Sequence, residues 1–165
     1  MKITADFNYK NGSGIFSAEL DIIGECDYSV KLTLTDINGN KVYESDKANV
    51  RATIPSVRPW SAEEPNLYIL TAEIIAGGRI VETAETKVGF RAFELKNGLM
   101  YLNGKRIIFK GVNRHEFNAK TGRAITEEDM LWDIKFIKQN NMNAVRTSHY
   151  PNNSRWYQLC DEYGI

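Results

Sequence analysis

Hydrophobic and polar residues alternate one by one along much of the first half of the chain, a pattern typical of β-strands with one face against a core. The alternation is clearest over residues 16–23 and 28–35. The Gly77-Gly78 pair predicts a tight turn between two further strands. Together these features predict an antiparallel, immunoglobulin-like β-sandwich. The other expected strands are 4–9, 41–45, 49–54, 67–76 and 79–90.

Prolines at positions 55, 59 and 65 interrupt the alternation and predict a rigid connection between the two sheets. Trp60 lies in this connection, and two interpretations are open for it. It could be exposed and stack on a sugar, or it could be packed beneath the connection. The tendency of Trp to be largely buried favours the second interpretation.

The pattern changes near residue 92. Asn97-Gly98 and Asn103-Gly104 are two hairpin signals, and a strand is expected from 107 to about 114. Thr126, followed by three acidic residues, is typical of a helix start, because a threonine caps free N–H groups and acids suit the positive end of the helix dipole. The remaining expected elements are a helix ending at 140–141, a strand at 143–148, and a helix opening at 151–153 and ending at Gly164.

Strand, helix, strand and helix in succession predict two parallel strands covered by helices. Two such strands cannot bury their own faces, and Ile165 looks like the first residue of a third strand. A (β/α)₈ barrel needs about 250 residues. We therefore expect a mainly β fold: a sandwich over 1–92, then the start of a truncated (β/α)₈ barrel over 93–165, with two βα units.

Composition excludes several classes of protein. The 165 residues carry 21 basic and 21 acidic side chains and no basic stripe, so a nucleic-acid partner is not expected. The hydrophobic runs are far shorter than the roughly 18 residues that cross a bilayer, so no membrane partner is expected. Cys26 and Cys160 lie far apart, without metal-ligand spacing. They predict separate thiols in a reducing compartment and, without a signal-peptide pattern, a cytoplasmic location.

The two histidines of the chain, His115 and His149, each follow one of the two expected parallel strands. Barrel enzymes carry their active sites at this end of the sheet. Asn113 and Arg146 add further donors for hydroxyls or carboxylates, which predicts a pocket for a polar small molecule. Glu116 is the nearest acid, but strand alternation points it away from His115, so no metal site is expected within the chain.

Several longer motifs resemble glycoside hydrolase family two. Residues 97–106 (NGLMYLNGKR) and 111–116 (GVNRHE) resemble the beginning of its catalytic barrel. Residues 140–152 (NNMNAVRTSHYPN) and 156–164 (WYQLCDEYG) resemble its signature over the second strand and helix. Residues 59–68 (PWSAEEPNLY) resemble the end of its immunoglobulin-like domain.

The β-galactosidase branch of that family fits best. β-Glucuronidase-like members usually carry Lys where this chain has Arg114, and they lack the Trp156-Tyr157 pair. The resemblance implies that His115 and His149 line a β-galactoside site and hydrogen-bond the sugar. It also implies that Arg146 lies near the nucleophilic carboxylate and keeps it ionised, with Asn113 supporting these residues.

The same resemblance implies that this chain alone is inactive. Retaining glycosidases use two carboxyl groups about 5–5.5 Å apart. In the family both are glutamates from later barrel strands, which would lie beyond Ile165, so no catalytic residue is expected here and Glu116 is not a substitute. Mg²⁺ is expected in the full-length parent and no cofactor in this chain. The parent is expected to be a homo-oligomer, and the exposed barrel edges predict that the chain dimerises.

Two alternatives stay open. One is a free-standing sandwich module with a binding or scaffolding role, since 1–92 looks complete. The other is a piece of a family-two β-glucuronidase or β-mannosidase.

Overall fold

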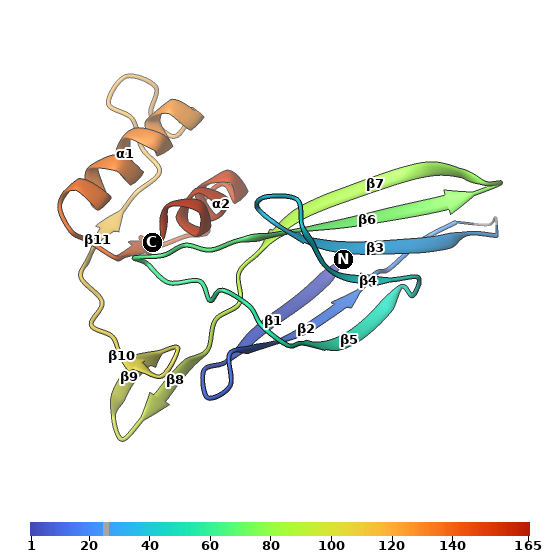
Figure 1. Ribbon diagram of the computed structural model, residues 1–165. Helices are drawn as coiled ribbons and strands as arrows, with labels where there is room; N and C mark the ends of the chain where they lie inside the picture. The colour runs from blue at the N-terminus through green and yellow to red at the C-terminus, as the bar shows by residue number, and fades with distance from the viewer. Residues whose placement is uncertain (25–26) are drawn as a thin grey trace.

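A computed structural model describes residues 1–24 and 27–165. It shows a β-sandwich over residues 1–92 joined to a smaller part over residues 93–165, the βα unit (Figure 1). The sandwich strands are β1 (Lys2–Asn8), β2 (Ser13–Glu19), β3 (Ser29–Asp36), β4 (Lys41–Ser45), β5 (Asn49–Ile54), β6 (Tyr68–Ala76) and β7 (Arg79–Val88). The elements that follow are β8 (Phe93–Lys96), β9 (Leu99–Leu102), β10 (Lys105–Arg106), β11 (Gly111–Arg114), α1 (Glu127–Gln139), β12 (Ala144–Thr147) and α2 (Ser154–Tyr163).

The sandwich consists of a three-stranded sheet, β1-β2-β5, facing a four-stranded sheet, β4-β3-β6-β7 (Figure 1). All of its strand pairs are antiparallel. Alternation along β3 buries Val30, Leu32 and Leu34 and leaves Lys31 in solvent, as the pattern predicted. The core between the sheets is formed by Phe16, Ala18, Val30, Leu32, Leu34, Val50, Ile54, Val57, Tyr68, Leu70, Ala72, Val88 and Phe90.

Two predicted strands differ from the structure by three or four residues at one or both ends, more than the others do. The strand expected at 16–23 is β2, which begins at Ser13 and ends at Glu19, because its ladder with β1 has these limits and its ladder with β5 also ends at Glu19. Gly14 lies in this strand, where a Cβ would come within 2.7 Å of the Phe90 ring. The strand expected at 107–114 is limited to Gly111–Arg114, because its ladder with β12 has only four residue pairs.

A small three-stranded sheet, β10-β9-β8, follows the sandwich. Both predicted hairpins are confirmed. Asn97 and Asn103 have φ of 52°, and the glycines after them have φ of 73° and 75°. Two successive residues with positive φ form the type I′ turn that suits the twist of paired strands.

The two helices pack on one side of the parallel pair β11–β12 (Figure 1). Helix α1 begins at the predicted cap, where the Thr126 hydroxyl accepts a hydrogen bond from the Asp129 N–H and the Asp129 carboxylate accepts one from the Thr126 N–H. The hydrogen bond from the Thr126 N–H to the carboxylate is the main cause of the lowered pKa of Asp129, and the Asn118 side chain contributes. The core beneath the helices contains Met130, Ile134, Ile137, Trp156, Leu159 and Cys160.

Trp60 links the sandwich to α2. It is only 5% exposed, and its Nε1 donates to the Asp161 carbonyl at 2.7 Å. The Lys138 ammonium donates to the carbonyls of Ala62 and Gly164 at 2.7 and 3.1 Å. The interpretation of Trp60 as a packed anchor is therefore confirmed, and the connection that carries it lies against the βα unit.

Burial raises the pKa of the Cys160 thiol to about 12, so this thiol is protonated at neutral pH. Cys26 lies outside the described residues. In the described part of the chain, neither helix is long and apolar enough to cross a membrane.

Candidate substrate-binding site at the strand ends

The parallel pairing of β11 and β12 brings the two histidines together. Asn113 lies opposite Arg146, and Arg114 lies opposite Thr147, so both strands leave the sheet at the same edge. The His115 and His149 rings meet edge to face, with centroids 5.7 Å apart and planes at 80°. Residues 34 positions apart in the sequence thus form one pair of imidazoles.

The four side chains expected in the site are all exposed. Asn113 and His115 are two residues apart and point to the same side of β11, while Arg114 between them is buried toward the helices. Arg146 lies beside Asn113 on the neighbouring strand, and its Nη1 is 3.5 Å from the Ser148 hydroxyl. The site is therefore an open, donor-rich edge suited to hydroxyl or carboxylate oxygens.

The segment that carries His149 is anchored from below. Ser148 is completely buried, and its N–H donates to the Arg114 carbonyl at 2.8 Å. The peptide bond between Ser148 and His149 is cis. The Tyr150 ring lies 6.0 Å from the His115 ring, and its hydroxyl accepts a hydrogen bond from the Glu116 N–H at 3.1 Å. Tyr150 is thus a third ring at this edge, which the sequence patterns did not indicate.

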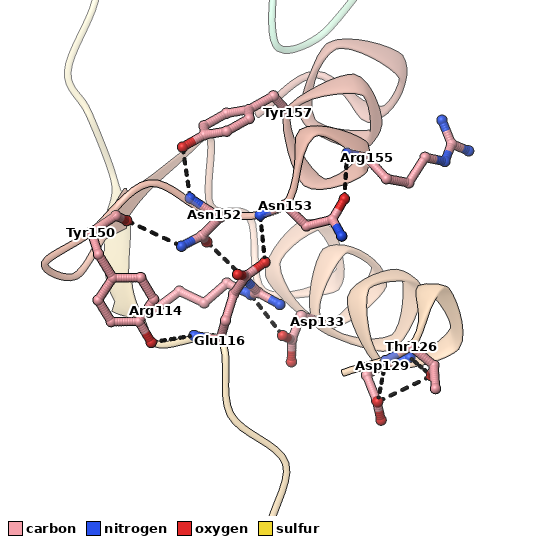
Figure 2. Close-up of polar contacts among 10 residues, drawn as sticks. All are labelled: Arg114, Glu116, Thr126, Asp129, Asp133, Tyr150, Asn152, Asn153, Arg155 and Tyr157. Atoms are coloured by element: carbon pink, nitrogen blue, oxygen red, sulfur yellow. Dashed lines mark hydrogen bonds and ion pairs between the residues drawn. The ribbon is translucent and has the colours of Figure 1, made fainter. Parts of the chain in front are cut away.

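Arg114, which precedes His115 in the sequence, is buried and lies at the centre of a polar cluster (Figure 2). Its Nε donates to the Asp133 carboxylate at 2.8 Å, and its Nη1 donates to the Asn152 side-chain oxygen at 2.8 Å. The guanidinium carbon lies 3.7 Å from the centre of the Trp156 ring. A buried charge is tolerated only when it is paired and hydrogen-bonded, which this arrangement achieves.

Glu116 belongs to the same cluster and faces α2. One of its carboxylate oxygens accepts from the Asn153 N–H at 2.8 Å and lies 3.8 Å from Arg114 Nη1 (Figure 2). An acid at a helix start is stabilised by the free N–H groups there. Across residues 1–24 and 27–165, no group of three His, Cys, Asp or Glu side chains could hold a metal ion.

Comparison with known families identifies the chain. Residues 1–91 match the family model of glycosyl hydrolases family 2, and residues 93–165 match the TIM barrel domain of the same family. The chain belongs to glycosyl hydrolases family 2. The resemblance of the sequence motifs is therefore confirmed, as are the immunoglobulin-like sandwich and the TIM barrel start.

Curated relatives of the chain are β-galactosidases. The enzyme of Streptococcus thermophilus is 52% identical over 99% of this chain and 17% of its own length. That of Clostridium acetobutylicum is 52% identical over 96% of this chain and 18% of its own length. The chain thus spans about a fifth of the length of these relatives.

Similar solved structures include β-glucuronidases. β-Glucuronidase 3 of Bacteroides uniformis is 30% identical, with a TM-score of 0.89 over 99% of this chain and 21% of that one. The enzyme of Parabacteroides merdae has a TM-score of 0.91 over 99% of this chain and 22% of that one, and at 24% identity it shows the shared fold alone.

Proposed function

We propose that this chain is part of a retaining β-galactosidase and supplies one side of its sugar-binding site. The observation that carries the proposal is the edge-to-face pair His115–His149 at the shared ends of β11 and β12. Active sites of barrel enzymes lie at this end of the strands. The 52% identity to two curated β-galactosidases supports galactose as the sugar.

In this proposal the exposed imidazoles of His115 and His149 hydrogen-bond sugar hydroxyls, and these bonds strengthen as charge develops in the transition state. Arg146 holds its positive charge beside the nucleophilic carboxylate and keeps that group ionised. Asn113, opposite Arg146 in the ladder, completes the donor set.

The reacting carboxyl pair is proposed to come from outside these 165 residues. Glu116 is the nearest acid to the histidines, but its carboxylate is occupied by the Asn153 N–H and lies beside Arg114. A retaining mechanism needs two carboxyl groups about 5–5.5 Å apart across the bond that is cleaved. Among residues 1–24 and 27–165, no group of three His, Cys, Asp or Glu side chains is placed to hold Mg²⁺.

β-Glucuronidase is the second candidate. The likeness to Bacteroides uniformis β-glucuronidase 3 over 99% of the chain favours it. An edge rich in donors could also receive the carboxylate of a glucuronide.

Reciprocal chimeras test the two candidates. In one, this chain replaces its matching segment in the Streptococcus thermophilus β-galactosidase; in the other, it replaces the matching segment of Bacteroides uniformis β-glucuronidase 3. Each folded chimera and the isolated chain are assayed with aryl β-galactoside, β-glucuronide and β-mannoside.

The proposal predicts that the first chimera hydrolyses the galactoside and that the second chimera shows no turnover. The reason is that the site residues of this chain complete only the pocket that matches them. Turnover of the glucuronide by the second chimera alone would favour the β-glucuronidase. Turnover by the isolated chain would contradict the proposal that the carboxyl pair lies elsewhere.

A further inference from the structure

Arg114 connects every segment around the histidine pair, although it faces away from that pair. It precedes His115 in β11 and is 7% exposed. Its partners come from three places: Asp133 in α1 and Asn152 in the loop after β12, both shown in Figure 2, and Trp156 in α2. One side chain therefore joins one histidine-bearing strand to both helices.

The segment 148–152, which carries His149, is held by Arg114 at both ends. At its beginning, the Ser148 N–H donates to the Arg114 carbonyl at 2.8 Å. At its end, the Asn152 side-chain oxygen accepts from Arg114 Nη1 at 2.8 Å. His149 and Tyr150 lie between these two attachment points.

Further hydrogen bonds fix the same segment. The Asn152 side-chain N–H donates to the Tyr150 carbonyl at 3.3 Å, and the Asn152 backbone N–H donates to the Tyr157 hydroxyl at 2.9 Å (Figure 2). The Tyr150 hydroxyl then accepts from the Glu116 N–H, immediately after His115. Movement of Asn152 would thus be transmitted to both histidine-bearing segments.

We propose that Arg114 is a positioning residue that sets the distance and angle between the His115 and His149 rings. The inference deepens the proposed function, since it assumes that these rings contact the sugar. The guanidinium suits this task because its planar fork can donate to Asp133 and Asn152 while its face lies on the Trp156 ring. A Lys ammonium has the charge but lacks the planar fork that makes both hydrogen bonds while its face lies on the ring.

The chain has only two histidines, so NMR signals of the imidazole rings report on this pair alone. The test compares the ring-to-ring nuclear Overhauser cross peak in the full 165-residue chain with that in Arg114→Leu and Arg114→Lys. Because sites of this kind must hold their groups to within about 1 Å, we expect the cross peak to fall about threefold or more in both variants. An unchanged cross peak and unchanged ring shifts would overturn the proposal.

Arg155→Leu is the matched control. Arg155 in α2 also bridges the helices, through Glu127 of α1 at 2.9 Å, and it pairs with Glu162 of its own helix at 2.8 Å. In the described part of the chain its side chain makes no hydrogen bond to residues 148–152. We expect the ring-to-ring cross peak of Arg155→Leu to equal that of the unsubstituted chain within experimental error. An equal loss in Arg155→Leu would overturn the proposal, because any loosening of the helices would then suffice.

Arg114→Leu could unfold the βα unit, since it removes the partner of a buried network. Asp133→Ala is the milder variant, because it keeps Arg114 and removes only the acceptor of its Nε. If Arg114→Leu does not fold, a weakened cross peak in Asp133→Ala supports the proposal, and an unchanged one overturns it. None of these measurements requires activity, so a failure of the proposed galactosidase function would be seen separately, in the chimera assays.

Discussion

The sandwich and the βα unit differ in how completely they bury their apolar side chains. The sandwich closes its core between two sheets, with Phe16, Leu32, Leu34, Leu70 and Phe90 fully buried. The βα unit buries a smaller group between two helices and a two-stranded sheet. In the described part of the chain, ten large exposed hydrophobic residues lie in 93–165 and eight in the longer stretch 1–92.

This contrast shows that the part over 93–165 leaves more of its apolar surface uncovered than the sandwich does. The two sheets of a sandwich bury their apolar side chains against each other, whereas a parallel pair of strands needs other elements to cover both of its faces. The candidate site lies on an edge of the βα unit, and the contacts of Trp60 and Lys138 join that unit to the sandwich. We interpret the sandwich as the rigid support on which the βα unit is held.

The largest expected effect comes from Ile134→Ala, which opens a cavity in the core of the βα unit. Such a change costs about 2–5 kcal/mol. That is comparable to the whole free energy of unfolding of roughly 4–11 kcal/mol expected for a unit of about 73 residues. Amide hydrogen exchange should therefore lose protection in α1 and α2 and keep it in β3 and β6.

Ile80→Ala is the control for that prediction, because Ile80 is 56% exposed on β7. It should change the free energy of unfolding by no more than about 0.5 kcal/mol. Loss of protection in the sandwich together with the helices would show one cooperative unit and remove the contrast between the two parts.

Trp60→Phe should have an intermediate effect, since it leaves the Asp161 carbonyl without its donor and reduces packing between the two parts. We expect a loss of about 2 kcal/mol in unfolding free energy, measured by urea denaturation. The same substitution at Trp132, which is 65% exposed, should cost about 0.5 kcal/mol or less. Equal costs at the two positions would mean that Trp60 does not stabilise the contact.

The smallest expected effect is that of Glu162→Gln, which removes an ionic link from α2 to Lys87 of β7 and to Arg155. The hydrogen bond from Arg155 is the main cause of the lowered pKa of Glu162, and Lys87 contributes. A carboxylate whose pKa is lowered by folding stabilises the protein above its unfolded pKa, and this contribution disappears as the pH falls through the folded pKa.

Wild type should therefore exceed Glu162→Gln in stability by about 1 kcal/mol or less at pH 7, and the difference should vanish below the ordinary carboxyl range. Urea denaturation at pH 7 and at pH 3 measures it. A difference that persists at low pH would assign the effect to packing and not to charge.

Local patterns were sufficient to predict most of the fold. Alternation predicted the buried positions of β3, and the cap at Thr126 and the two Asn-Gly hairpins lie where the sequence indicated. The limits of β2 were wrong, because the end of a strand depends on how far its partner extends, and alternation along one strand carries no information about β5.

The candidate site also combines a feature that local patterns predicted with one that depends on residues far apart in the sequence. The meeting of His115 and His149 followed from the shared edge of parallel strands. The Arg114 cluster could not be predicted, because its partners lie 19 and 38 residues away in the sequence, on elements whose relative orientation depends on packing. The one available signal was a polar residue at a position of β11 that alternation assigns to the helix side.

The most direct test of the account is the galactosidase activity of the Streptococcus thermophilus chimera with His149→Phe, beside the control Lys120→Ala on the exposed loop after β11. Phe keeps a ring in place and removes the hydrogen bonds of the imidazole. Loss of one transition-state donor predicts a fall of about 100-fold or more in kcat/KM for His149→Phe, with Lys120→Ala unchanged. Full activity in a folded His149→Phe chimera would contradict the assignment of these strand ends as the sugar-binding site.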